Sequence, residues 1–178
     1  IFFTSGGTEG DNWAVKAESL KRKHGHIIVS SIEHHAVTES ALWLKNYGID
    51  VTFAPVDEQG IIKLDQLEKM IRNDTFLISA SLANNEIGTI QPIENVCEIA
   101  HEYGAKVHSD AVAAFGHIDV DVKKLGVDFL NVSGHKICGP KGIGFLYVRG
   151  GKPERFMHGG GQENGLRAGT ENVAGIAG

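Results

Sequence analysis

The sequence predicts an α/β fold in which a mostly parallel sheet carries helices on both faces and includes one antiparallel strand. Short apolar runs alternate with helical patterns along most of the chain, and this alternation is typical of right-handed strand–helix–strand units. The last two apolar runs, 127–132 and 143–149, are joined by only about ten residues, whereas a parallel crossover needs about a dozen or more. We therefore expect that pair to be antiparallel.

The elements follow one another in a regular order. Each predicted strand is a short apolar run, and together they cover residues 1–3, 26–30, 49–54, 76–82, 105–108, 127–132 and 143–149. The predicted helices show apolar residues at spacings of three and four. They cover 8–23, closed by Gly25, 37–47, closed by Gly48, 64–71, and a segment that Pro92 opens and Gly104 ends. Residues 171–178 are expected to begin a further helix.

Composition excludes several classes of protein. The chain has 178 residues, of which 42% are hydrophobic and 22% charged, as expected for one globular domain. Its formal net charge is −5 without a dense basic run, which argues against a nucleic-acid surface. No signal peptide and no apolar run of about 18 residues is present, and two cysteines cannot form a disulfide framework. We therefore expect no membrane span and a cytoplasmic location.

Polar clusters follow the predicted strands, which is where open α/β sheets bind ligands. The clusters are 5–8, 33–35, 84–88, 108–110, 133–144 and 158–170. Four of them also have a purely structural interpretation. The first could only cap a helix, the two adjacent histidines could be solvated, the asparagines could form a turn, and Lys136 could be an exposed turn lysine.

Taken together, the clusters indicate one cofactor. Gly7 and Thr8 lie at a predicted helix start, where backbone N–H groups favour a phosphate. Asp110 ends an apolar strand, so its carboxylate should face a cation. Lys136 lies in a glycine-flanked bend after a strand, where an amine can act as a nucleophile. Pyridoxal phosphate (PLP) needs an amine, an acid at its ring nitrogen, a phosphate site and a group stacked on its ring.

Long motifs identify a family that the chain resembles. The segment Ser-Gly-His-Lys-Ile-Cys-Gly-Pro-Lys-Gly-Ile-Gly around Lys136, together with Asn-Asn-Glu-Ile-Gly, Gly-Gly-Thr-Glu and Arg-Ala-Gly-Thr-Glu-Asn, closely resembles the cysteine desulfurases, in the class V branch of fold-type-I PLP enzymes. The match covers essentially all of 1–178. It implies a PLP-dependent transferase-like large domain, and the chain ends imply a fragment lacking an N-terminal segment and a C-terminal small domain.

The resemblance also implies an activity and its partners. The enzyme would convert L-cysteine to L-alanine and transfer the sulfur as a persulfide to an acceptor protein, such as a scaffold for iron–sulfur cluster assembly. It would act as a homodimer. Lys136 would carry the cofactor as an internal aldimine, Asp110 would pair with the pyridinium nitrogen, and His34 would stack on the ring and assist proton transfer.

The remaining cofactor contacts are implied in the same way. Asn85 would bind near the phenolic oxygen, and Thr8, Ser133 and His135 would hold the phosphate, with Gly7 allowing its close approach. Thr170 would reach the phosphate of the neighbouring subunit.

The chain departs from the family in two respects. Ala113 stands where the family usually has a glutamine that contacts the phenolic oxygen of PLP. The family's nucleophilic cysteine lies on a loop beyond the end of this chain. Cys97 falls on the apolar face of a predicted helix and Cys138 lies in the turn after Lys136, so neither is expected to replace it. The chain alone is therefore expected not to release sulfur from cysteine.

Other interpretations remain open at this point. Within the same class, the protein could be a selenocysteine lyase or another class V lyase or aminotransferase. From a different class, it could be an inactive structural fragment that binds no cofactor. We expect no metal site, because no cysteine or histidine pair has the spacing of a zinc site.

Overall fold

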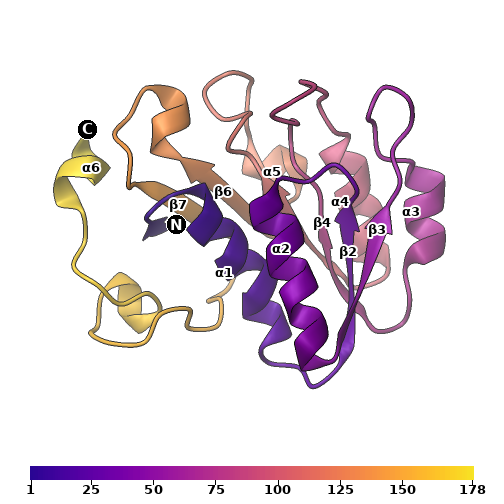
Figure 1. Ribbon diagram of the computed structural model, residues 1–178, viewed down its shortest axis with the longest axis horizontal. Helices are drawn as coiled ribbons and strands as arrows, with labels where there is room; N and C mark the ends of the chain where they lie inside the picture. Colours follow the sequence, from indigo (N-terminus) through magenta and orange to yellow (C-terminus); the bar gives the residue numbers. More distant parts are fainter.

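The computed structural model describes residues 1–178 and contains one seven-stranded sheet, shown in Figure 1. The strands are β1 (Phe2–Thr4), β2 (Gly25–Ser30), β3 (Ile49–Ala54), β4 (Thr75–Ser79), β5 (Lys106–Asp110), β6 (Phe129–Ser133) and β7 (Gly144–Val148). The helices are α1 (Gly7–Ser19), α2 (His35–Leu44), α3 (Leu64–Met70), α4 (Ile93–Glu102), α5 (Val122–Leu125) and α6 (Val173–Ala177), with short 3₁₀ turns η1 (Lys45–Tyr47), η2 (Gly134–Ile137) and η3 (Glu163–Gly165).

The strands lie in the order β1-β7-β6-β5-β4-β2-β3. Strands β2 to β6 pair in parallel, whereas β7 runs antiparallel to both of its neighbours, β6 and β1. The predicted α/β class and its antiparallel strand are therefore confirmed. Strands β6 and β7 are antiparallel because the link between them is short. It begins with the tight turn η2 and leaves no room for a crossover.

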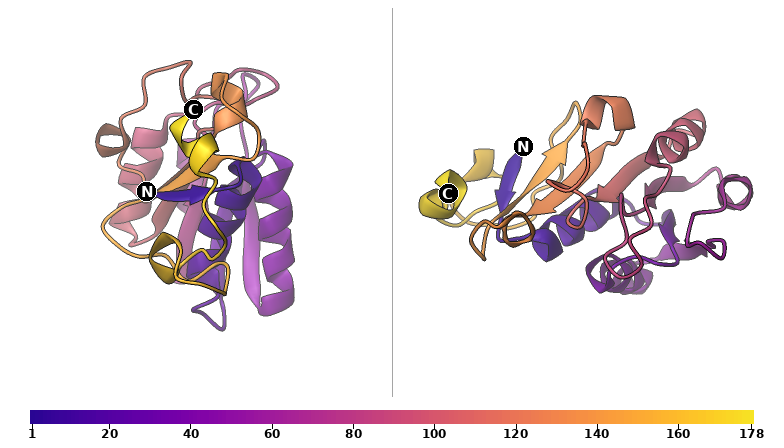
Figure 2. Two further views of the ribbon diagram at one scale, coloured as in Figure 1. Left: turned by 90° about the vertical axis from the view of Figure 1, so that its left-hand side faces the viewer. Right: turned by 90° about the horizontal axis from the view of Figure 1, so that it is seen from above.

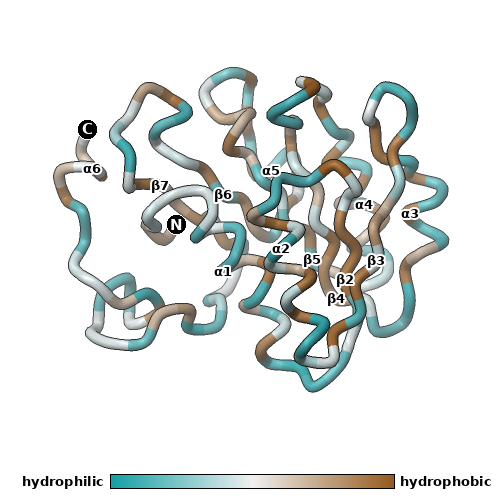
Figure 3. Tube along the Cα trace, viewed as in Figure 1, coloured by the Kyte–Doolittle hydropathy of each residue, from teal (hydrophilic) through white to brown (hydrophobic).

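Helices cover both faces of the sheet, as Figure 2 shows from above. On one face, α1 and α2 pack on a core that includes Trp13 and Leu44, and on the other face α3 and α4 pack on a core that includes Leu67 and Ile93. Alternate residues of β2 enter the two cores, because side chains of a strand point to opposite faces. The central strands are accordingly the most apolar part of the trace in Figure 3.

Some predicted boundaries were wrong. The first helix was expected to reach residue 23, but α1 ends at Ser19, and Gly25 opens β2 instead of closing a helix. Residues 20–24 are all exposed, so a longer helix would have no face to bury. The strand expected over 76–82 ends at Ser79, the last residue of β4 that pairs with β2. Helix α5 was not predicted.

The last part of the chain folds back along the sheet edge. After β7 it has little regular structure, and Figure 1 shows it running past β1 to α6. Two contacts fasten it to α1: Trp13 Nε1 donates to the carbonyl of Glu154 at 2.9 Å, and Arg167 forms a bidentate ion pair with Glu9 at 2.7 and 2.9 Å. None of the helices combines the length and the apolar composition that crossing a membrane would require.

Candidate functional site

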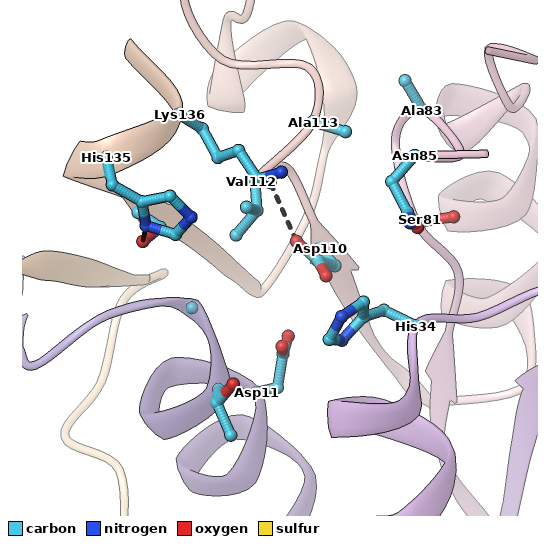
Figure 4. A pocket seen from close by; sticks show the side chains of 13 residues that line it. Asp11, His34, Ser81, Ala83, Asn85, Asp110, Val112, Ala113, His135 and Lys136 are labelled. Carbon is cyan, nitrogen blue, oxygen red and sulfur yellow. Dashed lines mark hydrogen bonds between the residues drawn. The ribbon is translucent and has the colours of Figure 1, made fainter. Parts of the chain in front are cut away.

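A cavity of about 260 Å³ opens at the carboxyl ends of β4, β5 and β6, beside the first turns of α1 and α2. Thirteen residues line it: Gly7, Thr8, Asp11, His34, Ser81, Ala83, Asn85, Asp110, Val112, Ala113, Ser133, His135 and Lys136. Figure 4 shows their side chains converging from several elements on one space. The cavity lies where ligands bind in open α/β sheets.

Eight of the nine predicted site residues line this cavity; the exception is Thr170. Thr170 is exposed on the segment before α6 and lies in a separate hollow with Glu163 and Arg167. Its predicted reach into a neighbouring subunit stays a prediction. The other eight come from five separate stretches of sequence, which the sheet topology brings together.

Asp110 ends β5 at the floor of the cavity and is only 6% exposed. Its Oδ1 accepts hydrogen bonds from the Val112 backbone N–H at 2.8 Å and from Asn131 Nδ2 at 3.4 Å. Burial raises the pKa of Asp110, while these two hydrogen bonds and the positive charges of His34 and Lys136 oppose the rise. The carboxylate is thus prepared to accept a cationic N–H from the cavity side.

Lys136 belongs to the short turn η2 that directly follows β6. The turn is closed by a hydrogen bond from the Gly139 N–H to the Gly134 carbonyl at 2.9 Å. Lys136 forms no ion pair, and Figure 4 shows its side chain extending into the cavity above Asp110. Its amine is therefore available to a ligand.

His34 forms the N-cap of α2 and its ring lines the cavity. Its Nδ1 accepts a hydrogen bond from the Ala36 backbone N–H at 3.1 Å, so in the neutral ring the proton lies on Nε2. Figure 4 shows the ring beside Asp110. The cap fixes the ring in place, which suits a group that stacks on a flat ligand or moves a proton.

The start of α1 can bind an anion. No side chain caps its N-terminus, so its first N–H groups are open to a ligand. Thr8, Ser133 and His135 surround this end, with the Ser133 Oγ and His135 Nδ1 2.8 Å apart. A Cβ added at Gly7 would lie 2.7 Å from Val112 Cγ2, so only glycine fits here without displacing the wall of the cavity.

Sequence reasoning missed Asp11 and Ser81, and it placed Glu33 in a polar cluster without assigning it a role. Asp11 is 1% exposed, lines the cavity and leaves its Oδ1 without a hydrogen-bond partner. Burial and the charges of Asp110 and Glu33 raise the pKa of Asp11 well above its usual range. Helical spacing could have indicated Asp11, because it lies one turn after Gly7 on the same helix.

Glu33 lies beside this cluster, directly before His34. Its Oε1 accepts a hydrogen bond from the Ser81 backbone N–H at 2.6 Å, and its Oε2 has no partner. Burial raises the pKa of Glu33 to about 8. Three buried carboxyl groups, of Asp11, Glu33 and Asp110, thus lie in or beside the cavity, and burial raises the pKa of each.

The residues present fit PLP. The cavity combines an amine, a buried carboxyl group opposite it, a fixed imidazole and an anion site at a helix start. Asp11 Oδ1 and Ser81 Oγ are buried polar atoms of cavity-lining residues that lack partners within the protein, as expected where a polar ligand completes the hydrogen bonds. A phosphorylated, cationic aromatic aldehyde matches this donor set.

The fold and the site together define a class of PLP-type α/β domain, and comparison with known proteins specifies the family. A family model described as "Aminotransferase class-V" matches residues 1–178, so the chain belongs to this family. Its curated relatives include "Cysteine desulfurase IscS" of Methanosarcina thermophila, 56% identical, and of Dictyoglomus turgidum, 54% identical. Both alignments cover 100% of this chain. The resemblance to cysteine desulfurases is thereby confirmed.

Solved structures agree with this assignment. "NIFS-LIKE PROTEIN" superposes with a TM-score of 0.93 at 48% identity, covering 98% of this chain and 49% of the other. "SspA in complex with cysteine" superposes with a TM-score of 0.93 at 44% identity, covering 98% and 52%. The chain spans about half the length of the curated relatives it matches, 45% and 46% of the two named above. The family is PLP-dependent in general.

Proposed function

We propose that the chain is the PLP-binding large domain of a cysteine desulfurase. The whole enzyme would take sulfur from L-cysteine, leave L-alanine, and pass the sulfur as a persulfide to an acceptor protein, such as an iron–sulfur scaffold. The observation that carries the proposal is the placement of the Lys136 amine above the Asp110 carboxyl group in one cavity, with His34 beside them. The names of the relatives support the choice of substrate.

Each residue would have a distinct task in this proposal. Lys136 would bind the cofactor aldehyde covalently, and Asp110 would hold a proton at the ring nitrogen. When bound, PLP supplies an electron sink that stabilises negative charge on the substrate carbon. His34 would stack on the ring and move a proton at its Nε2. The start of α1, with Thr8, would bind the phosphate.

The phenolic side of the ring would have fewer partners than in the family pattern. Ala113, which replaces the family glutamine, lines the cavity with a methyl group, and Asn85 is the one side-chain amide in the lining. Asn85 would therefore be the amide donor toward the phenolic oxygen. We further propose a homodimer in the cytoplasm, in which Thr170 reaches the phosphate site of the partner subunit.

The persulfide would be carried by a cysteine other than Cys97. Cys97 is 3% exposed in the core between α4 and the sheet. Burial raises the pKa of Cys97 to about 12, so it is not a nucleophile at neutral pH. Cys138 is exposed but lies in the turn just after Lys136, with a left-handed backbone, φ 64°, and a residue held in such a turn cannot travel to an acceptor.

The test is to identify the lysine that binds PLP in the full-length protein. The protein is incubated with PLP, reduced with borohydride and mapped by peptide mass spectrometry. The pyridoxyl label should fall on Lys136. Lys136→Ala should abolish both the label and the formation of alanine and sulfide from cysteine, while Lys141→Ala, five residues further in the same glycine-rich segment, should retain both. A label on Lys141 in the unmodified protein would show the assignment to be wrong.

A further inference from the structure

A chain of buried hydrogen-bonded side chains crosses three neighbouring strands and ends at Asp110. The Ser79 Oγ on β4 lies 2.8 Å from Nδ1 of His108 on β5, and His108 Nε2 lies 2.7 Å from Oδ1 of Asn131 on β6. Asn131 Nδ2 then donates to Asp110 Oδ1 at 3.4 Å. Ser79, His108 and Asn131 are each no more than 1% exposed. None of them lines the cavity.

The chemistry of the groups fixes which atom donates and which accepts in each of these hydrogen bonds. The Gly7 carbonyl can only accept, so the NH₂ end of the Asn131 amide faces it at 3.5 Å and also faces Asp110. Asn131 Oδ1 is left to face His108 Nε2, which therefore carries the proton and donates it. Burial lowers the pKa of His108 to about 4, which keeps the ring neutral and leaves Nδ1 to accept from the Ser79 hydroxyl.

His108 and the Gly7 carbonyl together favour this orientation of the Asn131 amide. A rotation of the amide by half a turn would present its oxygen to Asp110, and two acceptors would then face each other. That rotation would also turn the amide oxygen toward the Gly7 carbonyl, and His108 would have to move its proton from Nε2 to Nδ1 in order to accept from the amide NH₂. Helix α1 holds the side chain from the other side, because Gly10 packs so closely that a Cβ there would lie 2.7 Å from Asn131 Cβ.

We propose that His108 and Asn131 are positioning residues that hold Asp110 as an ionised hydrogen-bond acceptor facing the cavity. Asp110 receives two N–H donors, one from the Val112 backbone and one from Asn131, and only the second depends on a side chain. With both donors present, the proton that Asp110 shares with a pyridine nitrogen stays on nitrogen. This last step rests on the proposed function, whereas the effect on Asp110 itself does not.

The other titratable groups around Asp110 do not replace this donor. Asp11 on α1 places its Oδ1 3.5 Å from His108 Nε2, but burial raises the pKa of Asp11 and lowers that of His108, which disfavours the charged form of each group. Glu33 adds a buried carboxyl group that holds its proton up to a pKa of about 8. His34 and Lys136 act on Asp110 through their charges and not through a hydrogen bond.

The first experiment measures Asp110 without any cofactor. The pKa of Asp110 is measured by ¹³C NMR of its carboxyl group in the full-length protein and in its His108→Leu variant. Losing the Asn131 donor destabilises the ionised form, so the pKa should rise by about one unit, a tenfold change or about 1.4 kcal/mol. His108→Gln should restore most of the original value, because its amide N–H can donate to Asn131 Oδ1.

His26 provides a matched control. It is 1% exposed and also lies between two side chains of neighbouring strands, with Thr75 and Thr52 hydroxyls at 2.8 Å from its two ring nitrogens. His26→Leu removes an equally buried imidazole whose hydrogen bonds do not lead to Asp110, so the pKa of Asp110 should stay unchanged. An equal rise in His26→Leu and His108→Leu, or no rise in His108→Leu, would overturn the proposal.

The second experiment uses PLP labelled with ¹⁵N at its ring nitrogen. In the unmodified protein the ¹⁵N shift should be that of a pyridinium, and in His108→Leu it should move toward that of neutral, hydrogen-bonded pyridine, with His108→Gln in between. A raised Asp110 pKa in the cofactor-free variant together with an unchanged ¹⁵N shift would support the positioning role. The same result would overturn Asp110 as the partner of the ring nitrogen.

Discussion

Glu33 shows how a single buried residue links the site to stability. Its carboxyl group is inside the protein with one oxygen unpartnered, and burial raises its pKa to about 8. In the unfolded chain the same group releases its proton near its ordinary pKa of 4.5. Between these values the folded state binds more protons than the unfolded state, so stability falls as pH rises.

This gives a prediction for Glu33→Gln. His108, whose pKa is lowered by burial to about 4 from 6.5, acts in the opposite direction, but only below about pH 6.5. From pH 6.5 to 8 the free energy of unfolding should therefore fall by up to about 1.4 kcal/mol for each pH unit through Glu33. Urea unfolding at several pH values should show a shallower decline in Glu33→Gln, because glutamine still accepts the Ser81 N–H but carries no titrating proton.

Burial also raises the pKa of Asp11 and Asp110, which acts in the same direction as Glu33 and is left in place in Glu33→Gln. The exposed Glu39 on α2 serves as the control, and Glu39→Gln should leave the pH dependence as it is in the unmodified protein. An identical slope in the unmodified protein and in Glu33→Gln would show that Glu33 is ionised in the folded state.

The two cysteines should differ sharply in reactivity. Because burial raises the pKa of Cys97 to about 12, only about one molecule in ten thousand would carry its thiolate at pH 8, even if the thiol were accessible. Iodoacetamide should label the exposed Cys138 and leave Cys97 unmodified until guanidinium unfolds the protein. Cys138→Ser should remove the fast-reacting thiol, and rapid labelling of Cys97 in that variant would contradict the assigned burial.

At the residue scale, sequence motifs predicted the residues of the cavity better than the chemical type of a single side chain did. Lys136, Asp110 and His34 lie in or directly after strand ends, and the sequence shows those ends. Asp11 lies within a helix among ordinary polar residues, where only the tertiary contact with β6 makes it part of the cavity. Helical spacing from Gly7 could place Asp11 on the same face of α1, but it could not show how closely that face approaches the sheet.

At the scale of the element, α1 is placed by Gly10. An alanine inside a helix normally favours the helix over glycine by about 0.5–1 kcal/mol. Here the added Cβ would lie 2.7 Å from the Cβ of Asn131, an atom fixed to the β6 backbone. Gly10→Ala should therefore lower the free energy of unfolding by about 1–3 kcal/mol, as measured by urea denaturation.

Gly161 is the matched position for this prediction. It has nothing within 4 Å of an added Cβ and no left-handed backbone, so Gly161→Ala should be close to neutral. If Gly10→Ala proved as stable as Gly161→Ala, the close packing of α1 on Asn131 would be wrong. The positioning of Asn131 would then need another support.

The elements predicted from the sequence differ in accuracy for physical reasons. Strand β3 was predicted with its observed bounds, 49–54, because Gly48 closes the preceding turn with a left-handed φ of 80° and marks the start. The end of α1 was predicted too late. The charged residues that follow Ser19 are common in helices, but they are exposed and give a longer helix no face to bury. The four-residue α5 was missed because one turn is too short to show a period.

At the scale of the whole molecule, the sheet order explains why distant segments share one cavity. Strands β4, β5 and β6 are adjacent and parallel, so their carboxyl ends meet at one edge of the sheet. The turn after β6 supplies Lys136, the end of β5 supplies Asp110, and the segment after β4 supplies Asn85. The antiparallel β7 separates β1 from these strands without displacing the start of α1 from the cavity.

The same architecture predicts how stability is distributed along the chain. All residues of β2 and β4 are buried, and each of these strands has a parallel neighbour on both sides. Residues 150–172, in contrast, have little regular structure and are fastened mainly through Glu154 and Arg167. Hydrogen exchange followed by mass spectrometry should show the slowest exchange in peptides from β2 and β4 and the fastest in those from 150–172. Equal protection of both regions would contradict this distribution.

The segment around Glu163 has a consequence for behaviour at high concentration. β1 is the edge strand at one end of the sheet and has only three residues. The backbone N–H of its middle residue, Phe3, is bound by Glu163 Oε2 at 3.1 Å. A strand from another molecule would need that N–H to extend the sheet. The negatively charged side chain occupies it instead, so this edge resists the strand addition that leads to aggregation.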